Sequence, residues 1–165
     1  MSVKAGLPPI ARADARLFLL GSLPGDASLA AQRYYAHPTN QFWKLLGTVI
    51  GEELPLLDYD QRLARLAEAR IGLWDVIASA KRSGSLDQSI REIEHNRIAH
   101  LLHDFPELRA IAFNGSTASA IGRKLIGEPP DHIDLVDLPS SSAANTQPLS
   151  EKAGRWSELI KFVER

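Results

Sequence analysis

Short uninterrupted runs of hydrophobic residues alternate along this chain with longer stretches in which they recur at helical spacing. The first run is Leu17–Leu20, followed by Gly21. Four apolar residues in a row predict a strand that is buried on both faces, as in a parallel sheet. Similar runs predict further strands at about 71–77, 110–114 and 132–138.

Between these runs the apolar residues predict helices, at about 26–35, 40–50, 58–70, 98–105, 116–126 and 150–163. Thr39 or Asn40 is expected to cap the second helix, and Asp58 with Gln61 has the spacing of a capping box. Strands that alternate with helices predict an α/β fold, with a parallel sheet and helices on both of its faces.

Each predicted strand ends in a polar or Gly-rich loop, namely at 21–25, at Asp75 with 81–87, at 114–117 and at 139–145. The carboxyl ends of parallel strands lie at one edge of a sheet, so these loops are expected to converge on a single cleft. Free backbone N–H groups after the first strand can hold a phosphate or carbonyl oxygen there. The cleft is poor in carboxylates, which argues against a glycosidase that uses two of them.

Composition narrows the class of protein. The 165 residues, of which 44% are hydrophobic and 24% charged, predict one globular domain over 1–165. No apolar run approaches the roughly 20 residues of a membrane span, and no signal peptide is visible. The chain has no cysteine, which excludes thiolate chemistry and suits the expected cytoplasmic location. With a net charge of −1, contact with DNA would require a local patch or helix N-termini.

Two short segments resemble other kinds of site. Asn114–Ala118 reads N-G-S-T-A at a strand-to-helix turn, but Asn and Ala stand where a serine nucleophile elbow has glycine. His100 and His103 lie one helical turn apart without a third ligand at a recognisable spacing. We therefore expect a helix start at the first position and no metal at the second.

Six short motifs occur in order along the chain. They are G-S-L-P-G at 21–25, Y-Y-A-H-P-T-N-Q-F-W at 34–43, G-L-W-D-V-I at 72–77, G-S-L-D at 84–87, F-N-G at 113–115 and L-P-S-S-S-A-A-N at 138–145. Together they resemble the uracil-DNA glycosylase superfamily, and within it most of all the hypoxanthine-DNA (deoxyinosine) glycosylase branch. The resemblance covers nearly the whole chain, and linked motifs are far more specific than any one alone.

The resemblance implies a fold and a reaction. The superfamily is a three-layer α/β/α domain around a central four-stranded parallel sheet, in agreement with the strands predicted above. Its members flip a nucleotide out of DNA and cut the base–sugar bond with water, without a metal or redox cofactor. DNA is thus the expected partner, no cofactor is expected, and we expect a monomer.

The resemblance also implies which residues act. The catalytic asparagine of this branch lies in the H-P-x-N segment, which corresponds to Asn40; a helix cap is the alternative role for this residue. Leu23 stands where other branches often carry a catalytic Asn or Asp, and it cannot orient water. The expected base pocket contains Gly21, Ser22, Leu23, Pro24, Gly25, Phe42, Trp74, Asp75 and Asn114.

The motif at 138–145 matches the segment that grips backbone phosphates and enters the minor groove. Ala143 and Ala144 are small where other branches have a histidine or an aliphatic wedge, which leaves the wedge residue unidentified. Expected DNA contacts are Ser140, Ser141, Ser142, Asn145, Lys81, Arg82 and Gly115, with Arg33 and Lys152 as further basic candidates.

Deaminated bases carry a carbonyl where the parent base carries an amino group, so a pocket of N–H donors favours hypoxanthine, uracil or xanthine. The expected function is a monofunctional glycosylase that hydrolyses the N-glycosidic bond of such a base and leaves an abasic site. Two alternatives stay open: a uracil- or mismatch-directed glycosylase, and an inactive relative that binds DNA or nucleotides.

Overall fold

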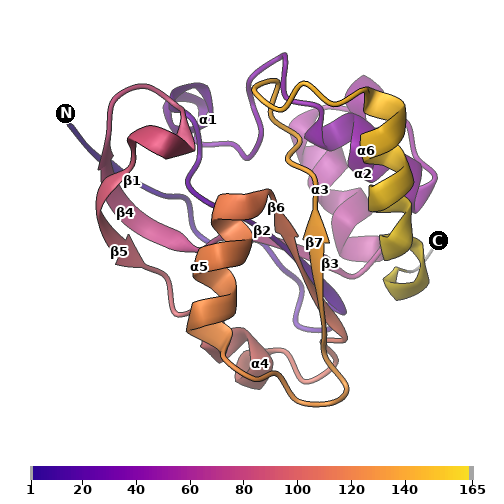
Figure 1. The fold of residues 1–165 in the computed structure, drawn as a ribbon. Helices are drawn as coiled ribbons and strands as arrows, with labels where there is room; N and C mark the ends of the chain where they lie inside the picture. The colour runs from indigo at the N-terminus through magenta and orange to yellow at the C-terminus, as the bar shows by residue number, and fades with distance from the viewer. Residues whose placement is uncertain (1, 164–165) are drawn as a thin grey trace.

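The computed structural model describes residues 2–163 and contains a central sheet of four parallel strands in the order β3-β2-β6-β7 (Figure 1). The strands are β2 (Leu17–Gly21), β3 (Ile71–Asp75), β6 (Ala110–Asn114) and β7 (Asp134–Leu138). They are the four strands predicted from the apolar runs, and they place their carboxyl ends at one edge of the sheet. The predicted layers, helices on both faces of a four-stranded parallel sheet, are confirmed.

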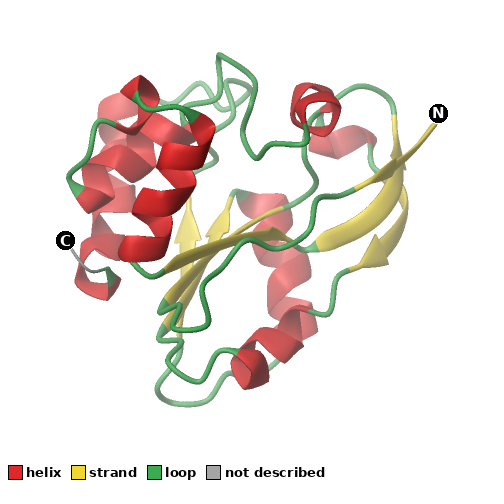
Figure 2. Ribbon diagram, turned by 180° about the vertical axis from the view of Figure 1, so that it is seen from behind, coloured by secondary structure: helices red, strands yellow, loops and turns green. Residues whose placement is uncertain are grey.

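Each strand contributes side chains to two separate cores, because successive side chains of a strand point to opposite faces. On β2, Leu17 and Leu19 join one core while Phe18 and Leu20 join the other, and all four are fully buried. The first core is covered by α2 (Phe42–Ile50), α3 (Tyr59–Glu68) and α6 (Leu149–Trp156), and the second by α4 (Leu101–Asp104) and α5 (Ser116–Ile126). Figure 2 shows the two groups of helices on either side of the sheet.

A second, antiparallel sheet was not predicted. It consists of β1 (Ser2–Ala5), β4 (Ile77–Arg82) and β5 (Arg91–His95) in the order β1-β4-β5. All five residues of β5 are exposed, so this strand lacks the apolar alternation that marks a half-buried strand. The expected basic loop at 81–87 is therefore wrong at its start, since Lys81 and Arg82 end β4.

The helix boundaries are partly as predicted. The capping box of α3 is confirmed: Asp58 Oδ1 accepts the N–H of Gln61 at 2.8 Å, and Gln61 Oε1 accepts the N–H of Asp58 at 3.1 Å. In contrast, α1 (Asp26–Ala31) is shorter than expected, because Gln32 adopts the left-handed conformation with φ +54° and ends the helix. Across residues 2–163, no helix has the length and apolar character of a bilayer span.

Candidate active site

The carboxyl ends of the four parallel strands surround a pocket of about 740 Å³. Its lining comes from 21–25, Asp75, 114–117 and 140–145 at the strand ends, together with residues from 34–40 and 85–88. The predicted convergence of the strand-end loops on one cleft is confirmed. Among the described residues, no lysine or arginine lines this pocket, so hydroxyls, amides and backbone groups supply most of its polar surface.

Asn40 lies in the pocket wall with the orientation of its amide fixed. Its Oδ1 accepts the N–H of Phe42 at 3.0 Å and the hydroxyl of Ser141 at 2.8 Å. Because a backbone N–H only donates, the amide oxygen must face Phe42. The two bonds occupy the oxygen's lone pairs and leave the Nδ2 group for a molecule in the pocket.

Asn40 therefore serves the start of α2 and the pocket at once. The N-cap residue of α2 is Gln41. Asn40 precedes it, and its Oδ1 accepts the N–H of Phe42, the first residue of the helix. Thr39 does not cap the helix, because its N–H and Oγ1 both bond to His37 Nδ1, at 3.1 and 2.8 Å. Of the two predicted cap residues, only Asn40 bonds to the helix start.

Asn114, at the end of β6, holds the loop 140–145 from the other side. Its Oδ1 accepts the N–H of Ser141 at 2.9 Å, and its Nδ2 donates to Ser141 Oγ at 2.9 Å and to Tyr35 Oη at 3.4 Å. Ser141 is fully buried, and its hydroxyl links Asn114 to Asn40. Ser141 lies in the pocket lining with its hydroxyl engaged in this network, and its contact with phosphate stays a prediction.

Asp75 ends β3 at the floor of the pocket and is 3% exposed. A Cβ at position 21 would lie 2.6 Å from Asp75 Oδ1 and 3.0 Å from Tyr35 Oη, so only glycine fits there. Asp75 Oδ2 has no hydrogen-bond partner within residues 2–163. Burial, together with the charge of Asp87, raises the pKa of Asp75 to about 7, against the opposing effect of Arg82. Near neutral pH this carboxyl can therefore carry a proton.

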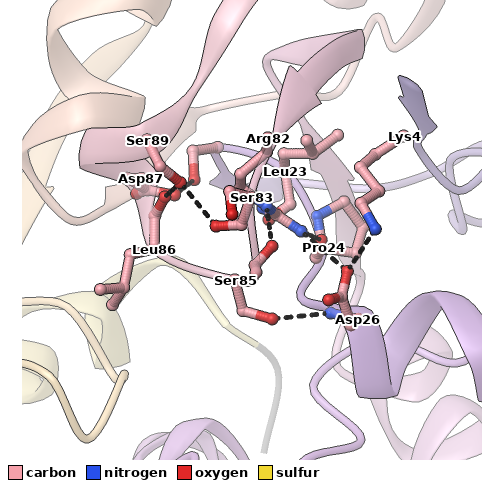
Figure 3. Close-up of polar contacts among 12 residues, drawn as sticks. Lys4, Leu23, Pro24, Asp26, Arg82, Ser83, Ser85, Leu86, Asp87 and Ser89 are labelled. Atoms are coloured by element: carbon pink, nitrogen blue, oxygen red, sulfur yellow. Dashed lines mark hydrogen bonds and ion pairs between the residues drawn. The ribbon is translucent and has the colours of Figure 1, made fainter. Parts of the chain in front are cut away.

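Arg82 lies beneath the G-S-L-P-G loop with its side chain wholly buried (Figure 3). Its guanidinium donates to the carbonyl oxygens of Leu23 at 3.3 Å, Pro24 at 2.6 Å and Gly84 at 2.7 Å. These bonds fix one pocket wall to the loop after β4. The predicted DNA contact of Arg82 is wrong, because its side chain is wholly buried and each of its three nitrogen atoms donates to a carbonyl oxygen inside the protein.

Lys152 makes an equivalent clamp on the opposite wall. It is 1% exposed, and its Nζ donates to Gln41 Oε1 at 2.9 Å and to the carbonyl oxygens of Ser142 at 3.3 Å and Asn145 at 2.8 Å. The ammonium group thus holds the loop 140–145 against the start of α2. The prediction that Lys152 reaches DNA is also wrong.

Three further predicted site residues lie outside the pocket lining. Phe42 is fully buried behind Tyr35, with the two rings stacked at 3.8 Å between centroids. Trp74 packs against the second core. Lys81 forms an ion pair with Glu92 at 3.0 Å on the antiparallel sheet. The base-pocket predictions for Phe42 and Trp74 are wrong, because neither residue belongs to the pocket lining: Phe42 is buried in the first core and Trp74 is partly buried against the second.

The remaining predicted residues do line the pocket: Gly21, Ser22, Leu23, Pro24, Gly25, Asp75, Asn114, Gly115, Ser140, Ser142 and Asn145. Tyr35 and His37 also line the pocket, although the sequence predicted no site role for them; in the segment 85–88, Gln88 lies one residue beyond the loop expected at the cleft. Tyr35 has φ +53°, a strained conformation for a residue that is not glycine. Its place in the Y-Y-A-H-P-T-N motif was the available signal, but the residue was assigned to the end of a helix.

No metal centre is formed by the part of the chain that the structure describes. Within residues 2–163, no three His, Asp or Glu side chains are grouped so that they could hold an ion.

Comparison with known proteins places this chain in a family. Residues 8–161 match the model of the uracil DNA glycosylase superfamily. The chain belongs to the uracil DNA glycosylase superfamily. Two relatives named hypoxanthine DNA glycosylase come from Methanosarcina barkeri (38% identity, 96% of this chain and 98% of the relative) and Methanosarcina acetivorans (37% identity, 96% and 99%).

A solved structure resembles the fold as well. It is the solution NMR structure of a Methanosarcina acetivorans protein assigned to the uracil DNA glycosylases, with 37% identity and a TM-score of 0.85 over 97% of this chain and 98% of that one. The pocket described above therefore lies at the carboxyl edge of the sheet in a chain with this family's fold.

Proposed function

We propose that this protein is a DNA glycosylase that flips hypoxanthine out of DNA and hydrolyses its N-glycosidic bond, leaving an abasic site. Uracil and xanthine are the next substrates expected, because they present a carbonyl at the corresponding position. The observation that carries the proposal is Asn40, which lies in an H-P-T-N segment at the pocket, with an amide NH₂ that has no hydrogen-bond partner among residues 2–163. The names of the Methanosarcina relatives support the choice of base.

In the proposed reaction, the sugar becomes oxocarbenium-like and negative charge develops on the departing base. Fixed N–H dipoles stabilise that charge without reorganisation. Backbone N–H groups of the G-S-L-P-G loop would face the base, and Asn40 Nδ2 would donate to the attacking water and hold it beside the sugar. Asn40 is thus proposed as the catalytic residue, as a positioner of water rather than a base.

Asp75 offers a second donor toward the base. Its buried carboxyl, with a pKa of about 7, carries a proton in a large share of molecules at neutral pH. A protonated carboxyl donates a hydrogen bond to a carbonyl oxygen, the feature that separates hypoxanthine from adenine. On this basis we propose that Asp75 takes part in the recognition of the base.

The test is an excision assay on matched oligonucleotides that carry inosine, uracil, xanthine or no lesion, followed by alkaline cleavage of abasic sites. We expect cleavage at inosine and none in the undamaged strand. Asn40→Ala should lower the single-turnover rate by about 10²-fold or more, the scale of losing one transition-state hydrogen-bonding group. No cleavage at any lesion by the folded parent protein would refute the proposed function.

Asn40→Ala also removes the bond to the start of α2, which costs about 1 kcal/mol of stability. A melting curve on the same sample separates this loss from the catalytic one. Asn40→Asp is the matched control, because its carboxylate keeps the bonds to Phe42 and Ser141 and offers a second oxygen to the water. A stable Asn40→Ala protein with the parent rate would end the catalytic assignment and direct attention to Asp75 and Asn114.

We further propose that the enzyme acts in the cytoplasm, in keeping with the absence of cysteine. We also propose that it acts as a monomer. Light scattering on the purified protein tests the oligomeric state.

A further inference from the structure

One large apolar side chain stands exposed at the mouth of the pocket. Leu86 is 49% exposed and belongs to the pocket lining. The other exposed large hydrophobic residues in the described chain lie outside that lining: Val3, Leu56, Ile93 and Leu149. Singly exposed apolar residues are common on protein surfaces; what sets Leu86 apart from the other four is its place in the pocket lining, where a bound nucleic acid would contact it.

The opposite rim has no comparable side chain. Ala143 and Ala144 are both exposed, and each ends at its Cβ. Around them the loop 140–145 presents serine and asparagine. Of the two rims, only the one formed by residues 83–89 carries a side chain long and apolar enough to enter a stack of bases.

The backbone beneath Leu86 is held in place. Ser89 Oγ bonds to the carbonyl oxygens of Leu86 at 2.8 Å and Ser83 at 2.9 Å. Asp87 accepts the hydroxyl of Ser22 at 2.7 Å, which ties the segment to the G-S-L-P-G loop. Figure 3 shows the Leu86 side chain pointing away from this group of polar contacts. The Leu86 side chain therefore projects away from a backbone segment that hydrogen bonds hold in place.

We propose that Leu86 is the wedge residue, which enters the DNA base stack and occupies the space left by the flipped nucleotide. Extruding a nucleotide costs a few kcal/mol in lost stacking and pairing, and an inserted apolar side chain offsets part of that cost by filling the gap. Leucine suits this role because it is apolar and takes up about the space between separated bases. The proposal rests on the proposed glycosylase function and assigns base flipping to the rim at 83–89.

A wedge residue is needed only when the base must leave a duplex. Comparing duplex with single-stranded substrate therefore distinguishes a wedge from a residue that contacts the base in the pocket. The experiment measures single-turnover excision of inosine from a duplex and from the same strand alone, for the parent and Leu86→Ala. We expect the variant to lose about tenfold or more on the duplex, a factor that corresponds to about 1.4 kcal/mol, and to stay within about twofold of the parent on the single strand. Leu86→Met, which keeps a long apolar side chain, should retain most of the duplex rate.

Leu56→Ala is the matched control, because Leu56 is 81% exposed and lies outside the pocket lining; its two rates should equal the parent's. An equal loss by Leu86→Ala on both substrates would overturn the proposal in favour of a base-pocket contact. An unchanged duplex rate would overturn it outright. If the parent excises inosine from neither substrate, the proposed function fails and the wedge assignment fails with it.

Discussion

Replacing Asp75 by asparagine tests the electrostatics of the pocket floor through stability alone. Asp75 is 3% exposed, and its Oδ2 has no partner among residues 2–163. Burial raises its pKa to about 7, whereas an aspartate in an unfolded chain titrates near 3.9. The folded protein therefore holds this proton more tightly than the unfolded chain does, and stability falls as pH rises between the two values.

The size of the effect follows from the difference between the two pKa values. About three pH units at 1.36 kcal/mol each give a penalty of about 4 kcal/mol that is complete above pH 7 and absent below pH 4. Roughly 2.5 kcal/mol of it develops between pH 5 and pH 8. Asparagine has the same shape and does not ionise. Relative to the parent, Asp75→Asn should therefore gain about 2.5 kcal/mol in free energy of unfolding over that range.

Urea unfolding followed by tryptophan fluorescence at several pH values between 5 and 8 measures this difference. Asp131→Asn is the control, since it removes the same charge from an exposed loop and reports the effect of net charge alone. If the free energies of unfolding of Asp75→Asn and the parent run parallel across this range, the carboxyl is not desolvated and the reasoning is refuted.

Three other predictions concern the walls and the exterior of the site. Gly21→Ala should reduce inosine excision by more than tenfold and destabilise the fold by about 1–3 kcal/mol, because its Cβ would meet Asp75 Oδ1 at 2.6 Å; excision rates and urea unfolding check both effects. Arg82→Met should cost about 3 kcal/mol, since three carbonyl oxygens lose their donor, and a thermal melt unchanged within 2 °C would contradict this. DNA affinity should depend weakly on salt, with a slope of log affinity against log salt of about −2 to −4, because no basic side chain among the described residues lines the pocket. Fluorescence anisotropy between 50 and 200 mM salt measures that slope, and a value near −8 would reveal a basic surface that the pocket does not explain.

The central sheet was predictable because its strands are buried on both faces. Leu17–Leu20 reads as an unbroken apolar run, since alternate side chains enter different cores and both cores are apolar. The strand β5 gave no such signal, because each of its residues faces solvent and its place depends on pairing with β4. Sequence patterns thus predict a strand by what it buries, and they miss one that is held only by backbone hydrogen bonds.

The site was predictable in its location and only partly in its members. The ends of the predicted strands indicate correctly which loops form the cleft. The sequence does not show that the basic residues Arg82 and Lys152 are buried, and it predicts DNA contacts for both. Each side chain donates to oxygen atoms from a segment far along the chain: Arg82 to the carbonyl groups of Leu23 and Pro24, and Lys152 to Gln41 Oε1. Lys152 also donates to the nearby loop 140–145. Nothing in the local sequence distinguishes such a lysine or arginine from a solvated one, because the acceptors are assembled only by the fold.

The hydrogen bonds that join the pocket walls also determine when the pocket forms. Asn40 and Ser141 are 101 residues apart in the chain, and Ser22 and Asp87 are 65 apart. Contacts across such separations form after the entropy of closing long loops has been overcome. The pocket is therefore complete only when these distant segments of the chain have come together around the sheet.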